Sequence, residues 1–188
     1  MLDLIHLSDR RVSRRPLALI AGLVLSVCLA AGGAAAQTTA TGPSGLALPR
    51  YVSLKADRVN VRRGPGRDYP IAWVFQRAGL PVEVVKEYDH WRRVRDSEGA
   101  LGWVHVRLLS GRRTALVLPW KVKKQNPEPV PVHASASRGA SPLALVQPGT
   151  VADVIKCDGT WCRVAIQGYR GWLEQKLLWG VYENEHIE

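Results

Sequence analysis

Apolar and polar residues follow two different patterns along this chain. Residues 17–31 form one uncharged apolar run, whereas beyond residue 50 apolar and polar residues mostly alternate in short stretches, among them 81–86, 91–95 and 101–104. A period of two is typical of β-strands that bury one face, and no stretch beyond residue 50 keeps a helical period for more than about two turns. The pattern therefore predicts an N-terminal apolar segment followed by an all-β protein.

The N-terminal segment has the layout of a secretory signal peptide. Four arginines between positions 10 and 15 precede the apolar run, and Ala34 and Ala36 are the small residues that favour cleavage between Ala36 and Gln37. An uncleaved anchor is the alternative, because residues 17–36 are 20 uncharged residues, about enough to cross a bilayer. The glycine- and alanine-rich end favours cleavage. We therefore expect a signal helix within residues 1–36 and a periplasmic or secreted protein with no stable membrane span afterwards.

Two further features of this segment leave the export route open. Residues 13–17, Ser-Arg-Arg-Pro-Leu, resemble a twin-arginine export signal. Cys28 resembles a lipoprotein cysteine, but bulky Val27 precedes it and the apolar run continues past it, so we interpret Cys28 as part of that run. Cleavage removes four arginines and two aspartates, which lowers the formal net charge from +10 to +8, and it leaves Cys157 and Cys162 as the remaining cysteines.

The rest of the chain repeats itself at a spacing of about 70 residues. Gly79 matches Gly149 and Trp91 matches Trp161 at an offset of 70, and residues 102–103 match 171–172 after a slip of one residue. Two copies are too few for a stacked repeat array, so each copy needs its own small core. We expect this organisation: signal peptide 1–36, flexible leader 37–49, first barrel 50–110, basic connector 111–118, second barrel 119–181 and acidic tail 182–188. The connector is also a candidate for an additional strand.

The repeated unit resembles a known family. Residues 59–66, Val-Asn-Val-Arg-Arg-Gly-Pro-Gly, are similar to the opening signature of bacterial SH3-type domains, and Trp91-x-x-Val94 and residues 102–104 are similar to their second half. The second unit keeps the alternation at 130–132 but lacks the Asn-x-Arg and Gly-Pro residues. Residues 157–164 and 178–181 resemble the tandem, two-unit kind that Gram-negative bacteria export. The resemblance implies a five-stranded, partly open SH3-like barrel for each unit and a non-catalytic role, with cell-wall peptidoglycan or envelope proteins as partners.

Cys157 and Cys162 flank an Asp-Gly turn, which predicts that they face each other across a hairpin. Directly opposite residues of an antiparallel pair are close enough for a disulfide, which would contribute roughly 2 kcal/mol to a marginal barrel. A redox thiol is the alternative, but it lacks a C-x-x-C motif and a nearby base. In the first unit Glu87 and Arg92 occupy the equivalent positions, where we expect a weak cross-strand ion pair.

No constellation of catalytic or metal-ligating residues stands out after the signal segment. The four histidines there are spaced neither as an H-E-x-x-H motif nor as a zinc site, and there is no G-x-S-x-G elbow or phosphate-binding glycine loop. We interpret His90, in a tight turn, and His105, just after a strand, as solvated. The sequence therefore predicts no catalytic residue, no metal and no cofactor.

Aromatic and arginine residues near the first long loop are candidates for a ligand groove. Trp91 and Trp161 recur beside a hairpin turn, where core packing and a groove wall both remain open, whereas we expect core or half-core packing for Trp103 and Trp172. Arginine forks match carboxylates and phosphates, and aromatic faces suit sugars or extended peptides. The candidate groove residues are Arg62, Arg63, Arg67, Tyr69, Trp73, Tyr88, Trp91 and Trp161.

These features define three functional hypotheses. The first is an exported binding module that recognises peptidoglycan or another anionic cell-envelope polymer. The second is a protein–protein adaptor or activator of an envelope enzyme. The third is an enzyme, for which the chain shows no activated nucleophile or metal set. Export argues against nucleic acid as the partner of the basic surface.

Overall fold

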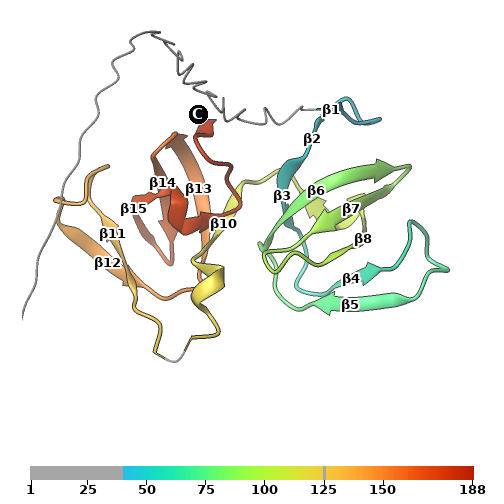
Figure 1. The fold of residues 1–188 in the computed structure, drawn as a ribbon, viewed down its shortest axis with the longest axis horizontal. Helices are drawn as coiled ribbons and strands as arrows, with labels where there is room; N and C mark the ends of the chain where they lie inside the picture. Colours follow the sequence, from blue (N-terminus) through green and yellow to red (C-terminus); the bar gives the residue numbers. More distant parts are fainter. Residues whose placement is uncertain (1–39, 125) are drawn as a thin grey trace, which may run out of the picture. The chain divides into compact units, whose positions relative to one another are not determined.

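The computed structural model describes residues 40–124 and 126–188, and these residues form β-strands and three short 3-10 helices (Figure 1). The strands build a sheet of seven strands in the order β5-β4-β8-β7-β6-β3-β9. A second sheet of eight strands has the order β12-β11-β15-β14-β13-β10-β16, with β17 paired to β13. The all-β fold with two SH3-like units is thereby confirmed. The expected signal helix lies outside the described residues.

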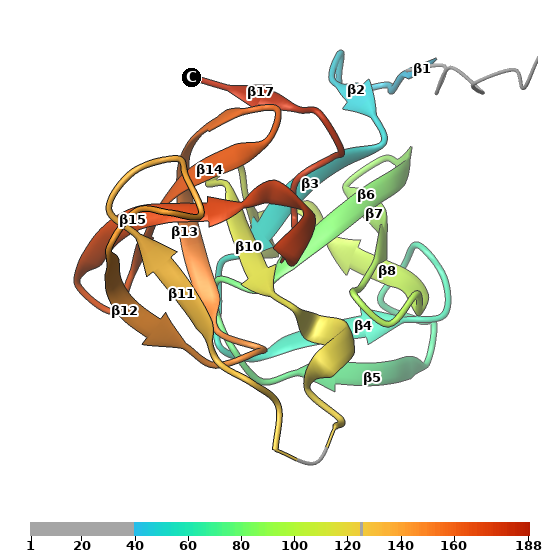
Figure 2. The same cartoon turned by 60° about the vertical axis from the view of Figure 1, so that its left-hand side comes forward.

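Apart from β17, the two sheets correspond strand for strand. The first contains β3 (Arg50–Leu54), β4 (Val59–Arg62), β5 (Ile71–Phe75), β6 (Pro81–Tyr88), β7 (Trp91–Arg95), β8 (Leu101–His105), helix η1 (Val106–Leu108) and β9 (Leu109–Ser110). The second contains β10 (Thr114–Val117), helix η2 (Pro119–Lys121), β11 (Val130–His133), β12 (Pro142–Val146), β13 (Val151–Asp158), β14 (Trp161–Ile166), β15 (Tyr169–Glu174), helix η3 (Gln175–Leu177), β16 (Leu178–Trp179) and β17 (His186–Ile187). In both units the first long hairpin, β4–β5 or β11–β12, ends the sheet on one side (Figure 2).

Each barrel encloses a small core, and the core of the first consists mainly of β-branched residues, which pack well on a pleated surface. In the first unit the buried cluster is Leu54, Val59, Val61, Val82, Val84, Val94 and Val104. The repeated Gly-Trp pair has a packing reason. A Cβ on Gly102 would lie 2.3 Å from Val61 Cγ1, and one on Gly171 would lie 2.5 Å from Val132 Cγ1. The backbone of β8 and of β15 therefore approaches the core so closely that only glycine fits.

Segments at the borders of the two units also join the sheets. The four residues of β10 are buried and pair with β13 and β16, so the apolar centre of the basic connector is a strand of the second sheet. In the leader, β1 (Ala40–Thr41) and β2 (Ala47–Leu48) form a hairpin. In the acidic tail, Ile187 of β17 pairs with Cys157.

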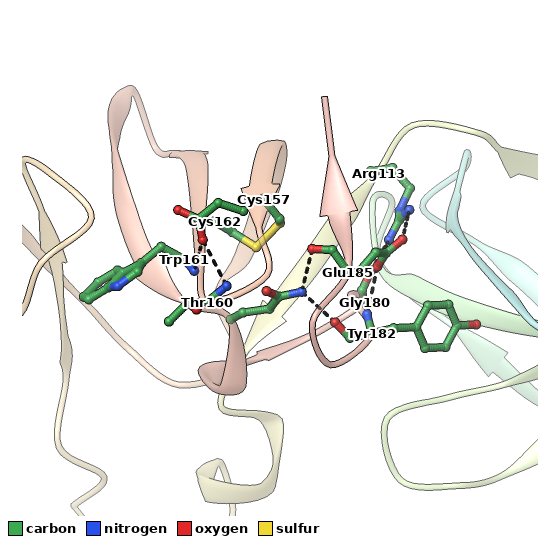
Figure 3. The surroundings of a disulfide bond; sticks show 10 residues. Arg113, Cys157, Thr160, Trp161, Cys162, Gly180, Tyr182 and Glu185 are labelled. Carbon is green, nitrogen blue, oxygen red and sulfur yellow. Dashed lines mark hydrogen bonds and ion pairs between the residues drawn. A yellow bond between two sulfur atoms is a disulfide. The ribbon is translucent and has the colours of Figure 1, made fainter. Parts of the chain in front are cut away.

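The tail is held by a second set of contacts around Glu185. Its carboxylate accepts hydrogen bonds from Arg113 Nη1 at 2.8 Å and from the backbone N–H of Tyr182 at 2.8 Å (Figure 3). Arg113 also donates to the carbonyl of Gly180 at 3.0 Å. The tail is thus attached to the second barrel at Arg113, next to β10, and at the end of β13.

The disulfide between Cys157 and Cys162 is present and joins β13 to β14 beside the hairpin turn (Figure 3). Its Cα atoms are 4.1 Å apart. Across the turn, the carboxylate of Asp158 accepts hydrogen bonds from the backbone N–H groups of Thr160 and Trp161 at 2.9 and 2.8 Å. These bonds, Trp161 first, lower the pKa of Asp158. The disulfide and the two hydrogen bonds to Asp158 therefore both hold the Asp-Gly turn in place.

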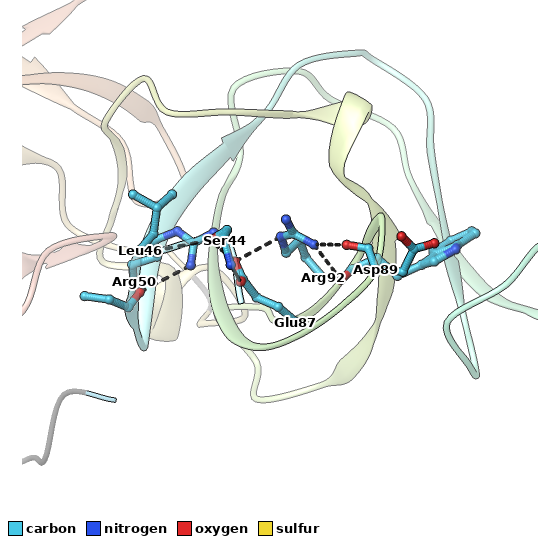
Figure 4. Close-up of polar contacts among 8 residues, drawn as sticks. Ser44, Leu46, Arg50, Glu87, Asp89 and Arg92 are labelled. Carbon is cyan, nitrogen blue, oxygen red and sulfur yellow. Dashed lines mark hydrogen bonds and ion pairs between the residues drawn. The ribbon is translucent and has the colours of Figure 1, made fainter. Parts of the chain in front are cut away.

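At the equivalent place in the first barrel, Glu87 and Arg92 form a buried ion pair rather than a weak surface one. Arg92 Nε lies 3.1 Å from Glu87 Oε1, and the Glu87 side chain is 1% exposed. Glu87 also accepts from Arg50 Nη2 at 2.7 Å and from the N–H and Oγ of Ser44 at 2.9 and 2.8 Å (Figure 4). Burial raises the pKa of Glu87, but the bonds from Ser44 and Arg50 and the charge of Arg92 outweigh it and lower the pKa to about 2. Ser44 of the leader hairpin thus supplies two of the hydrogen bonds that satisfy this buried carboxylate.

The two barrels belong to one compact unit and contact each other through aromatic and polar side chains. The ring of Tyr51 packs against Trp179 at 5.3 Å and against Tyr182 at 4.7 Å between ring centroids. Tyr182 Oη donates to Glu83 at 3.0 Å. Burial raises the pKa of both tyrosines, and the charge of Glu83 adds to this, so both hydroxyls stay protonated at neutral pH.

Candidate ligand-binding groove

The first barrel carries a cationic groove with a volume of about 250 Å³. It lies where β4, the loop after β4, the start of β7, the end of β8 and helix η1 meet. Its lining residues are Asn60, Arg62, Arg67, Trp91, His105, Arg107 and Leu108. The sheet register explains this gathering, because Trp91 lies opposite His105 and Arg62 lies opposite Trp103. Three residues predicted from the sequence, Arg62, Arg67 and Trp91, therefore meet in one groove.

Trp91 and His105 form the floor of the groove. Their rings meet edge to face, with centroids 5.3 Å apart and an interplanar angle of 82°. Trp91 is only 9% exposed, so little more than the rim of its ring reaches the groove. The position of His105 just after a strand predicts a solvated ring. It is half-buried instead, because the chain turns into η1 directly after it and folds the ring against Trp91.

The protonation of His105 follows from its contacts. Its Nδ1 accepts a hydrogen bond from the backbone N–H of Arg107 at 3.2 Å, so in the neutral ring the proton is on Nε2. Burial lowers the pKa of His105, and the positive charges of Arg107, His90 and Arg67 lower it further against the opposing effect of Asp89. His105 is therefore neutral at pH 7 and offers an Nε2–H donor.

The arginines give the groove its charge. Arg62 Nη1 donates to the carbonyl of Tyr69 at 2.7 Å, which holds its guanidinium beside the long loop. Among residues 40–124 and 126–188, none of Arg62, Arg67 and Arg107 forms an ion pair with a carboxylate. Three unneutralised guanidinium groups around one groove create a local positive potential that attracts anions.

The other residues predicted for the groove lie elsewhere. Tyr69 is 48% exposed and its ring covers Gly64, where a Cβ would lie 2.3 Å from it. Tyr88 is opposite Trp91 in the sheet and 60% exposed, but it does not line the groove, and neither does exposed Arg63. Trp73 packs edge-on against Phe75 and close to Gly102, while Trp161 belongs to the second barrel. Roles of these side chains in binding stay predictions.

The tryptophans after the two glycines are half-buried, which lies within the expected core or half-core packing. Gly102 and Val104 face the core, so the alternation of β8 places Trp103 on the outer face, where it is half-buried. Trp172 is half-buried in the same way, with Lys156 Nζ 5.4 Å from the centroid of its ring. The glycine, not the tryptophan, makes the close core contact. Trp91 and Trp161 are the more buried pair, each 9% exposed.

Sequence reasoning missed four residues of the groove: Asn60, His105, Arg107 and Leu108. Asn60 stands in the Val-Asn-Val-Arg signature, and Arg107 opens a basic stretch, so both had a signal in the sequence. His105 had none, because its contact with Trp91 depends on the register between β7 and β8.

The bacterial SH3 domain model matches the chain twice, at residues 55–111 and 126–180. The chain therefore belongs to the bacterial SH3 domain family and carries two tandem copies of the domain. Domains of this family are generally binding modules for cell-wall or protein partners and occur in extracellular and envelope proteins.

Two solved structures from Trichomonas vaginalis resemble the chain at low identity. NlpC2 is 14% identical with a TM-score of 0.31, and the match covers 70% of this chain and 48% of that one. NlpC1 is 13% identical with a TM-score of 0.31, and the match covers 76% of this chain and 49% of that one. The matches thus span about half the length of these two proteins. No curated protein matches the chain.

Residues 40–124 and 126–188 contain no group of three or more His, Cys, Asp or Glu side chains placed to hold a metal ion. The same residues contain no helix long and apolar enough to cross a membrane.

Proposed function

We propose that this protein is a non-catalytic, exported binding module that recognises peptidoglycan or another anionic cell-envelope polymer through the groove of its first barrel. The observation that carries this proposal is the convergence of Arg62, Arg67 and Arg107 on Trp91, without a carboxylate partner for these arginines among the described residues. Guanidinium forks match carboxylates and phosphates, so the groove suits an acidic ligand.

The burial of Trp91 decides which part of the ligand dominates recognition. Because this ring is only 9% exposed, stacking on it buries little area, and charge contributes most of the attraction. Peptidoglycan offers peptide-stem carboxylates beside sugar rings. The carboxylates suit the arginines of the groove, and the sugars suit the exposed edge of the Trp91 ring. Binding that depends on exposed charge weakens as salt rises, since the Debye length falls from about 30 Å at 0.01 M to about 8 Å at 0.15 M ionic strength.

The proposed location follows from the N-terminal segment and the family. Residues 1–36 have the layout of a cleaved signal peptide, and bacterial SH3 domains occur in extracellular and envelope proteins. A periplasmic or secreted protein meets cell-wall polymers directly. N-terminal sequencing of the exported protein tests this step, with Gln37 expected as the first residue.

Co-sedimentation with purified cell-wall sacculi tests the function. The mature protein is expected to pellet with sacculi at low salt and to be released as salt rises. Arg62→Gln and Arg67→Gln should each reduce pelleting several-fold. Arg170→Gln removes an equal charge from an exposed site of the second barrel and should leave pelleting unchanged. Equal pelleting of all four proteins, or none at any salt, contradicts the proposal.

The adaptor hypothesis is favoured by a different surface. Strand β12 is the outer strand of the second sheet and exposes Leu143 and Leu145, 46% and 66% exposed. An apolar edge strand without charges is suited to pairing with an extended segment of another protein. Crosslinking that recovers one stoichiometric envelope protein, lost in Leu145→Lys while sacculus binding persists, supports an adaptor or activator role.

A further inference from the structure

The residues around the groove of the first barrel have counterparts in the second barrel, and three of the five matched pairs differ in residue type. Arg62 Nη1 bonds the carbonyl of Tyr69 at 2.7 Å, and His133 Nδ1 contacts the carbonyl of Ala140 at 3.0 Å in the matching loop of the second barrel. Arg62 and His133 lie opposite Trp103 and Trp172 respectively. The two loops therefore correspond at an offset of 71 residues, and later matched residues at 70 or 69. The matched pairs are Arg62 and His133, Arg67 and Arg138, Trp91 and Trp161, His105 and Glu174, and Arg107 and Lys176.

In the second barrel, Glu174 fills the place of His105, and we call the site formed by the matched residues His133, Arg138, Trp161, Glu174 and Lys176 the second groove. Trp161 lies opposite Glu174 just as Trp91 lies opposite His105. Arg138 grips the Glu174 carboxylate with two bonds, from Nε to Oε1 and from Nη2 to Oε2, each 2.8 Å long. Lys176 Nζ lies 2.9 Å from Oε2. The side chain of Glu174 is 16% exposed, so its carboxylate lies within the surface rather than on it.

We propose that Glu174 acts as a built-in carboxylate that occupies the anion site of the second groove, and that the first groove binds a carboxylate of its ligand in the same place. In that place the ligand is gripped by the fork of Arg67 with Arg107 as the second cation and the Nε2–H of His105 as a further donor. This inference rests on the proposed function and specifies it: the ligand is a carboxylate, and it binds at the first groove, whose cations are not already paired with a carboxylate among the described residues.

The charge balance of the two grooves supports this assignment. The Arg138 bonds, followed by Lys176, lower the pKa of Glu174 to about 2 against the opposing effect of burial, so the carboxylate is ionised at neutral pH. In the first groove, the matching cations have no carboxylate partner among the described residues. A charge-assisted, two-bond grip on a carboxylate is among the stronger polar contacts in proteins.

Because the Glu174 carboxylate is part of the chain, it competes strongly with a carboxylate of a dissolved ligand. A tethered group acts at an effective concentration on the order of millimolar or higher. An external carboxylate must therefore displace Glu174 from Arg138 before it can enter the second groove. Replacing Glu174 with a neutral side chain should open that groove, and placing a glutamate at His105 should close the first one.

Titration of the mature protein with N-acetyl-alanyl-alanine tests the inference, followed by the indole N–H signals of Trp91 and Trp161 in NMR spectra. In the unmodified protein only the Trp91 signal should shift. The C-terminal amide of the same peptide should bind at least about tenfold more weakly, because it cannot form charge-assisted bonds. Inorganic phosphate is the second probe. Binding of phosphate with equal or higher affinity would overturn the assignment to a carboxylate.

Two reciprocal substitutions make the result independent of one variant's folding. Glu174→Gln should add a shift at Trp161 and raise the stoichiometry from one site to two, whereas His105→Glu should abolish the shift at Trp91. Arg138→Gln is the matched control, because it removes the fork and should add no second site. Peptide binding at Trp161 in the unmodified protein, or no second site in a folded Glu174→Gln protein, overturns the inference.

The outcomes also separate this inference from the proposed function. A peptide carboxylate that shifts Trp91 while sacculi do not bind refutes the polymer as ligand and keeps the carboxylate site. Sacculus binding that depends on Arg67, with equal affinity for the peptide acid and its amide, keeps the polymer and refutes the carboxylate site.

Discussion

The buried carboxylate of Glu87 should contribute more to stability than any exposed charge of this protein. Its side chain is 1% exposed and is contacted by Arg92, Arg50 and Ser44 at distances between 2.7 and 3.1 Å. Glu87→Gln keeps the shape but leaves two arginines without their counter-charge. Breaking a buried ion pair on one side costs about 3–5 kcal/mol, and because glutamine retains an acceptor oxygen we expect a loss of about 3 kcal/mol.

The pH dependence of this loss has a definite sign. The folded-state pKa of Glu87 is about 2, below its ordinary value of 4.5. A carboxylate with a depressed pKa stabilises the folded state fully above the unfolded value, and this contribution disappears as pH falls through the folded value. The difference between the unmodified protein and Glu87→Gln should therefore be full at pH 7 and clearly smaller at pH 3.

Urea unfolding of the mature protein, followed by tryptophan fluorescence at both pH values, measures these differences. Glu98→Gln is the matched control, because Glu98 pairs with Lys123 in an exposed bridge, with side chains 66% and 80% exposed. An exposed bridge contributes about 0.2–1 kcal/mol. A cost for Glu87→Gln no larger than that of the control, or a cost equal at pH 3 and pH 7, refutes the reasoning.

Three further predictions concern the disulfide, a close backbone approach and a histidine. Replacing both Cys157 and Cys162 with serine should lower the free energy of unfolding by about 2 kcal/mol, and the unmodified mature protein should show no free thiol in mass spectrometry. Gly102→Ala should cost about 1–3 kcal/mol in urea unfolding because its Cβ meets the core, whereas Gly111→Ala, with nothing within 4 Å, should cost little. His105 should titrate in NMR spectra below its ordinary pKa of 6.5, so its neutral form favours the folded state, and this contribution is lost as pH falls through that region. A His105 pKa at or above 6.5 contradicts the half-buried, cation-flanked position.

Much of the fold was readable because it depends on local periodicity. The alternation over 81–86 and 91–95 became β6 and β7, and the Asp-Gly turn became the hairpin that brings Cys157 and Cys162 together. The repeat at an offset of about 70 became two sheets of the same strand order. The contacts that the leader and the tail make with the barrels could not be predicted from local periodicity. The leader reaches Glu87 and the tail reaches β13 through contacts distant in sequence, which no local pattern encodes.

The residues of the candidate groove also divide into those that local sequence patterns predict and those that depend on tertiary contacts. Arg62, Arg67 and Trp91 could be proposed from the sequence because they stand near a loop and a turn that the alternation reveals. The sequence did not decide whether Trp103 packs in the core or beside it, because alternation shows that two faces differ but not which face is the core. The close approach of Gly102 to Val61 decides that.

By itself, the sequence determined the strand class, the repeat, the disulfide and the cationic character of the first loop, since each follows from spacing along the chain. Only the tertiary structure decided that His105 and Glu174 occupy the same place in the two barrels. The physical reason is register: which side chains share a groove depends on which residues lie opposite across a sheet. Because of that pairing, the Glu174 carboxylate neutralises Arg138 in the second barrel, whereas the groove of the first barrel stays cationic.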